Sequence, residues 1–187
     1  MIWSKWIFYI IFRKLIFIIN RKVMNKTIFI IRHAKAELHS FNKQDFKRNL
    51  IGEGIDRAKI IAKKLNEQLS IDQKTLFISS SANRAKQTAE LFADELNYPQ
   101  DNIRFEEEIY EASAKEILTL INSISDDCNT ILLFGHNPGI SAFVNYCCDT
   151  YISLRTSECA EIRLLEGIDF TTLSHHMATL NQLISEE

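Results

Sequence analysis

The stretch "TIFIIRHAKAE", residues 27–37, decides how the fold of this chain is interpreted. Residues 27–31 are β-branched or aromatic, which is typical of a fully buried strand, and the apolar pattern stops at Arg32 and His33. In open α/β sheets, ligands bind outside the carboxyl ends of the strands. A charged pair directly after a buried strand therefore predicts a functional site at this end of a sheet.

Strand and helix patterns alternate along the rest of the chain. Further strands are predicted at residues 75–79, 103–105, 130–134 and 159–165, and helices at 55–69, 85–96, 114–124 and from Pro138 to about 147. The alternation favours the α/β class, as a three-layer αβα sandwich around a mostly parallel sheet. The end of the chain gives no clear pattern.

The charge distribution bears on the class of ligand. The whole chain has a net charge of -2, but residues 1–24 hold five basic side chains and no acidic one. The remainder has 17 basic side chains (22 less 5) against 24 acidic ones. Such an acidic domain is unsuited to holding nucleic acid through phosphate contacts, so any phosphate must be captured by a few converging groups.

Residues 1–24 form an apolar, basic extension that is interrupted by Arg13 and Lys14. A spanning helix needs about 20 mostly apolar residues, and central charges are costly there. Three interpretations stay open: a membrane-surface segment, a packed helix, or translation upstream of a true start at Met24. Membrane contact is expected only in the first case. The domain itself is predicted at residues 25–187.

The cysteines indicate a reducing compartment. The chain has four of them, Cys128, Cys147, Cys148 and Cys159, without CxxC or Cys/His metal spacing. Buried thiols in a cytoplasmic protein are therefore expected.

The candidate functional residues lie at the ends of three predicted strands. Arg32 and His33 follow the first strand, Arg84 follows the second long one, and His136 follows residues 130–134. Two guanidinium groups suit a dianionic phosphoryl group, and a neutral imidazole can attack phosphorus while a second stabilises the transition state. Each residue alone also has a structural interpretation: a structural histidine, a surface arginine or a turn residue.

Three blocks resemble the histidine phosphatase superfamily, which includes cofactor-dependent phosphoglycerate mutase. They are "RHAKAE" (32–37), "SSSANRAKQTA" (79–89) and "FGHNPGI" (134–140). Ala34 after the histidine, the "HNP" form and the short length are most similar to SixA-type phosphohistidine phosphatases.

The resemblance implies a phosphoglycerate mutase-like fold and a role for each matching residue. His33 would be the phosphorylated nucleophile, and Arg32, Arg84 and His136 would form the phosphate pocket. Arg48 matches an Arg-x-Leu-Thr segment, with Ile51 where threonine is usual. Arg48 is therefore a further candidate for binding phosphate, and a solvated loop arginine is its alternative.

The general acid is a separate question. Superfamily members that act on alcohol phosphates place a glutamate after the third strand, and in "FEEEIYEAS" (105–113) Glu108 matches best. The alternative is a solvated run of glutamates, without a dedicated acid. Imidazole, with a reference pKa of about 6.5, leaves readily, whereas an alkoxide needs a delivered proton.

The sequence thus predicts a phosphatase that works through a phosphohistidine and needs no metal and no cofactor. The expected substrate is phosphohistidine on a phosphotransfer protein. A phosphatase of small phosphoesters and a catalytically silent module that binds phosphorylated partners are the alternatives.

Overall fold

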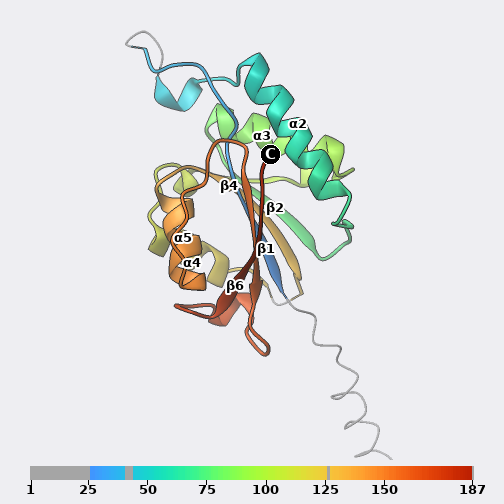
Figure 1. Ribbon diagram of the computed structural model, residues 1–187, viewed down its shortest axis with the longest axis vertical. Helices are drawn as coiled ribbons and strands as arrows, with labels where there is room; N and C mark the ends of the chain where they lie inside the picture. Colours follow the sequence, from blue (N-terminus) through green and yellow to red (C-terminus); the bar gives the residue numbers. More distant parts are fainter. Residues whose placement is uncertain (1–25, 41–43, 126, 187) are drawn as a thin grey trace, which may run out of the picture.

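The computed structural model describes residues 26–40, 44–125 and 127–186 (Figure 1). The extension at residues 1–24 lies outside the described residues, so its three interpretations stay predictions. Within the described part, no helix combines the length and the apolar character needed to cross a membrane.

A six-stranded sheet forms the centre of the molecule, in the order β3-β2-β4-β1-β5-β6. The strands are β1 (Thr27–Arg32), β2 (Thr75–Ser80), β3 (Arg104–Glu106), β4 (Thr130–Gly135), β5 (Cys159–Leu164) and β6 (Ala178–Ile184). Strands β1 to β4 are mutually parallel, and β5 and β6 pair antiparallel at one side. The predicted mostly parallel sheet is confirmed.

Helices cover both faces of this sheet (Figure 1). They are α2 (Gly52–Asn66), α3 (Asn83–Glu95), α4 (Ala114–Asn122) and α5 (Gly139–Cys148). The apolar sides of α2 and α3 belong to one core cluster, and those of α4 and α5 belong to the other. The β1 residues divide between the two clusters, because successive side chains of a strand point to opposite faces. The predicted three-layer αβα sandwich is therefore confirmed.

The structure differs from the sequence expectation at the end of the chain. Strand β6 gave no recognisable pattern, because among its residues only Ala178 and Ile184 are buried. Pairing with β5 makes it a strand, and that pairing joins segments whose relation is not visible in local composition. Helix α2 also begins earlier than predicted, at Gly52, since Ile51 provides no side-chain cap that the sequence could reveal.

The strand register places the candidate residues at one edge. Strand β1 lies between β4 and β5, with Arg32 opposite Gly135 of β4. On the other side of β4, Ser79 of β2 lies opposite Phe134. The carboxyl ends of β1, β2 and β4 are consequently adjacent, and the residues that follow them share one rim.

Candidate active site

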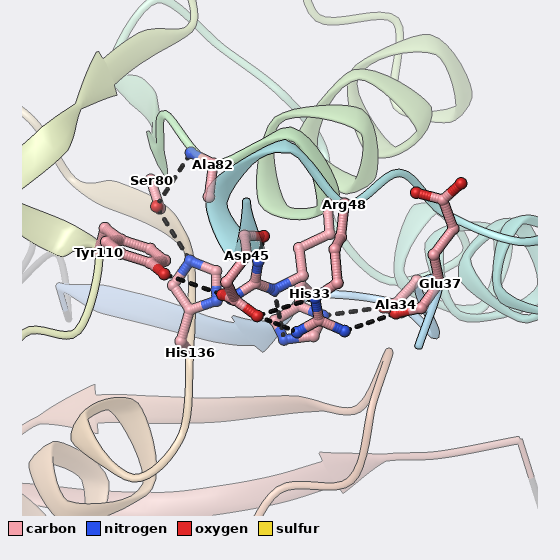
Figure 2. Close-up of polar contacts among 10 residues, drawn as sticks. His33, Ala34, Glu37, Asp45, Arg48, Ser80, Ala82, Tyr110 and His136 are labelled. Atoms are coloured by element: carbon pink, nitrogen blue, oxygen red, sulfur yellow. Dashed lines mark hydrogen bonds and ion pairs between the residues drawn. The ribbon is translucent and has the colours of Figure 1, made fainter. Parts of the chain in front are cut away.

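His33, Arg84 and His136 lie together at this rim although they come from three separate segments. His33 follows β1, Arg84 is the second residue of α3, and His136 follows β4. The two imidazole rings are 5.0 Å apart between centroids, and Arg84 Nε donates to His33 Nε2 at 3.3 Å (Figure 2). All three side chains are buried.

The His33 ring is fixed in one tautomer by its own neighbourhood. Nδ1 lies 2.8 Å from the carbonyl oxygen of Ala34, which can only accept, so Nδ1 carries the proton. Nε2 consequently presents a lone pair. Burial lowers the pKa of His33 to about 4; the Ala34 carbonyl opposes this, and the charges of Arg84 and Arg32 add to it. His33 is thus a neutral imidazole near neutral pH, as a nucleophile must be.

Asp45, which the sequence did not single out, is held between Arg48 and Arg84. Its Oδ1 accepts from Arg48 Nε at 2.8 Å, and its Oδ2 accepts from Arg84 Nη2 at 2.9 Å and from the Tyr110 hydroxyl at 2.8 Å (Figure 2). Arg84 Nη1 also donates to the Asp45 backbone oxygen. Desolvation would raise the pKa of Asp45, but the Tyr110 hydrogen bond and the two arginine charges lower it to about 2.

The ionised Asp45 carboxylate therefore accepts hydrogen bonds from Arg48 and Arg84 that a bound phosphoryl group would also need. The only hint in the sequence is the spacing of Asp45 and Arg48, which lie three residues apart around the short helix η1 (Asp45–Lys47). The contacts with Arg84 and Tyr110 bridge 39 and 65 residues, and no local pattern encodes them.

Arg48 makes a further contact in the site region, and Arg32 also reaches it. Arg48 is half-buried and donates through Nη1 to the Glu37 carbonyl oxygen at 2.6 Å. Arg32 donates through Nη1 to the Leu154 carbonyl oxygen at 2.9 Å, while its buried Nε has no partner among the described residues. Burial lowers the pKa of Arg32, and the charge of Glu158 opposes the shift. Arg32 thus keeps one buried N–H donor without an acceptor among the described residues.

His136 uses one ring nitrogen and leaves the other unbonded. Nε2 lies 2.9 Å from the Ser80 hydroxyl, and the ring meets Tyr110 edge to face with centroids 5.5 Å apart. Nδ1 is buried and has no partner among the described residues. Burial lowers the pKa of His136 to about 3, and the neighbouring His33 and Arg84 contribute.

Glu108, the candidate acid, lies on the short helix η3 (Glu107–Ile109) and is exposed. Within the described parts of the chain, the structure shows no hydrogen bond from its side chain to the four residues at the strand ends. The hydroxyl of Tyr110, two residues later, donates a hydrogen bond to Asp45. The role of Glu108 stays a prediction that the geometry does not favour.

Taken together, the site is a neutral imidazole, His33, next to the buried guanidinium of Arg84 and the half-buried guanidinium groups of Arg32 and Arg48. Guanidinium donors form charge-assisted hydrogen bonds to oxyanions, and His136 can add a donor once an acceptor arrives. This arrangement suits transfer of a phosphoryl group.

Comparisons with known proteins agree with this class of site. The family model described as histidine phosphatase superfamily (branch 1) matches residues 28–124. The chain therefore belongs to the histidine phosphatase superfamily. None of the curated proteins that were compared matches it.

Solved structures show the same fold. A protein from Agrobacterium tumefaciens assigned as the phosphohistidine phosphatase SixA is 22% identical, with a TM-score of 0.70 over 87% of this chain and 99% of that one. The protein histidine phosphatase SixA in complex with tungstate is 24% identical, with a TM-score of 0.71 over 85% and 96%. A mycobacterial glucosyl-3-phosphoglycerate phosphatase is 11% identical, with a TM-score of 0.61 over 86% and 99%. These likenesses establish the fold alone.

Proposed function

We propose that the protein is a phosphohistidine phosphatase that works through phospho-His33. The observation that carries the proposal is the His33 ring: Nδ1–H is held by the Ala34 carbonyl, and the Nε2 lone pair faces Arg84 in a cationic pocket. Membership of the histidine phosphatase superfamily and the SixA-like fold support the same reaction.

The reaction would proceed in two displacements. His33 Nε2 attacks phosphorus, the bond from phosphorus to the substrate nitrogen breaks, and that imidazole departs as a neutral base if its other nitrogen is protonated. The positive charge on phospho-His33 is stabilised at Nδ1–H by the Ala34 carbonyl oxygen. Water then attacks phosphorus, neutral His33 is restored, and phosphate and one proton are released.

The ionised state of Asp45 supports the choice of substrate class. Asp45 is the carboxylate in contact with Arg84 and Tyr110, and with a pKa of about 2 it is ionised. A leaving imidazole needs no delivered proton near neutral pH, whereas an alkoxide does. A phosphohistidine on a phosphotransfer protein therefore fits this pocket better than a sugar phosphate.

The pocket residues would divide the remaining work. Arg32, Arg84 and Arg48 would bind the phosphoryl oxygens, and His136 would stabilise charge as it shifts in the transition state. Because these groups supply positive charge themselves, we propose that the reaction needs no metal, and EDTA should leave the rate unchanged.

Trapping the intermediate tests the proposal. Wild type mixed with a 32P-phosphorylated phosphotransfer protein should form an acid-labile, base-stable phosphoenzyme, and His33→Ala should form none. Circular dichroism must show that the variant is folded. Phosphoenzyme formation or turnover above a few per cent in folded His33→Ala would show that another residue is the nucleophile.

Glu108→Gln separates the substrate classes. Because Glu108 is exposed and the proposed leaving group needs no acid, phosphohistidine hydrolysis should change less than about twofold. If Glu108 were the acid for an unactivated alkyl phosphate, the loss would be about 10²–10⁴-fold. Efficient sugar phosphate hydrolysis that Glu108→Gln removes would instead support the small-phosphoester alternative.

A further inference from the structure

The hydroxyl of Ser80 lies against the pocket histidine. Ser80 ends β2 and is completely buried, and its Oγ is 2.9 Å from His136 Nε2. The backbone N–H of Ala82 donates to the same oxygen at 3.3 Å (Figure 2). His136 Nδ1, on the other side of the ring, is buried without a partner in the described part of the chain.

Counting protons decides which of the two groups donates. A serine hydroxyl has one proton and two lone pairs, and a neutral imidazole has one N–H and one lone pair. If His136 donated through Nε2, Ser80 Oγ would accept twice, from His136 and Ala82. Two buried groups would then be unsatisfied: the Ser80 proton, for which the described residues offer no other acceptor, and the Nδ1 lone pair.

The opposite arrangement leaves a single group unsatisfied. If Ser80 donates to Nε2, only the Nδ1 proton lacks a partner. An unsatisfied buried polar group costs about 1–3 kcal/mol, so the arrangement with fewer such groups is favoured. Its one open donor is also the group that a phosphoryl oxygen would satisfy on binding.

We propose that Ser80 is a positioning residue that keeps the His136 proton on Nδ1, so that His136 donates to the transferring phosphoryl group. This inference rests on the proposed function for its catalytic consequence, but the tautomer itself does not. Ser80 touches no substrate; it acts only through the His136 ring. Without it, the proton can move to Nε2, and Nδ1 would then present a lone pair to an oxyanion.

The wild-type protein provides the first test. Long-range ¹H–¹⁵N NMR spectra of protein with ¹⁵N-labelled histidine distinguish the two neutral tautomers, and a His136→Asn variant identifies the signals of His136. We expect the Nδ1–H form of His136 without ligand, and a downfield shift of that proton on addition of tungstate. An Nε2–H form in the wild type would overturn the proposal without any change at Ser80.

Substitutions provide the second test. Ser80→Ala should shift His136 towards Nε2–H and lower kcat roughly 10–100-fold, the range found when partners that orient metal-bound histidines are removed. KM should change little, because the lost hydrogen bond strengthens in the transition state. Ser80→Thr keeps the hydroxyl and should restore both the tautomer and kcat.

Ser79→Ala is the matched control. It removes a second fully buried hydroxyl from the same strand, whose bond goes to the Ser80 carbonyl oxygen and not to His136. It should lower stability without altering the tautomer. A Ser80→Ala protein with wild-type tautomer and kcat, or an equal kcat loss in Ser79→Ala, would show that Ser80 is merely structural.

The outcomes also separate this inference from the proposed function. Absence of a phosphoenzyme together with an Nδ1–H His136 would reject the reaction but retain the positioning role in anion binding. A normal phosphoenzyme together with an Nε2–H His136 would support the proposed reaction and reject the positioning role of Ser80.

Discussion

At the scale of single residues, both pocket histidines are buried as neutral rings. The pKa of His33 is lowered to about 4 and that of His136 to about 3, and burial is the largest cause of each shift. Histidine signals followed by NMR should therefore show both rings titrating well below 6.5. A midpoint near 6.5 for His33 would mean that the ring is more hydrated than the structure shows.

The same shifts predict a pH dependence of stability. Between pH 6.5 and about 4, the unfolded chain binds protons at His33 and His136 that the folded chain does not bind. Stability rises with pH wherever the unfolded state holds more protons. The free energy of unfolding from urea titrations should consequently fall as pH is lowered through this window, and His136→Asn should reduce the slope.

At the scale of elements, the η1 segment places its first residue in the pocket. Asp45 contacts both Arg84 and Arg48, so we expect its carboxylate to compete with an incoming oxyanion for these two arginines. Removal of this competing charge by Asp45→Asn should tighten tungstate binding by about tenfold, equivalent to ~1.4 kcal/mol. Isothermal titration calorimetry measures the difference without requiring turnover.

Glu53→Gln is the control for that measurement. It removes one negative charge from an exposed ion pair with Lys35, and should leave tungstate affinity nearly unchanged. Equal or weaker tungstate binding by Asp45→Asn would mean that the carboxylate orients the arginines for the ligand and does not compete with it.

Helix α2 approaches the loop after His33 at a glycine, Gly54. A Cβ on Gly54 would lie 2.1 Å from the Lys35 backbone oxygen, whereas one on Gly52, in the same helix turn, would meet nothing within 4 Å. Gly54→Ala should lower the free energy of unfolding by about 1–3 kcal/mol through overpacking. Gly52→Ala should be neutral or slightly stabilising in the same urea titration. Equal effects of the two substitutions would contradict the close approach.

At the scale of the whole molecule, the described members of both core clusters run from residue 28 to residue 184. We propose that residues 25–187 are the folded unit and that a chain starting at Met24 unfolds at the same urea concentration as the full chain. Both tryptophans of the sequence, Trp3 and Trp6, precede Met24, so unfolding must be followed by circular dichroism. A markedly lower midpoint would place residues 1–23 in the domain.

Some of this architecture could be predicted from the sequence, because its causes are local. The apolar composition of residues 27–31 indicated a buried strand, and the abrupt change at Arg32 and His33 marked its carboxyl end. Alternating strand and helix patterns then implied a sheet with one functional rim. Arg84 and His136 followed from the same rule, and the structure brings both next to His33.

Tertiary structure alone decided what surrounds those residues. Asp45 meets Tyr110 across 65 positions, and Ser80 meets His136 across 56, so neither pair has a spacing that local periodicity could reveal. Strand β6 likewise exists through its pairing with β5. The sequence determined which residues reach the rim because strand ends are set by local composition. The protonation and hydrogen bonding of those residues depend on burial and on distant partners, which exist only once the chain has folded.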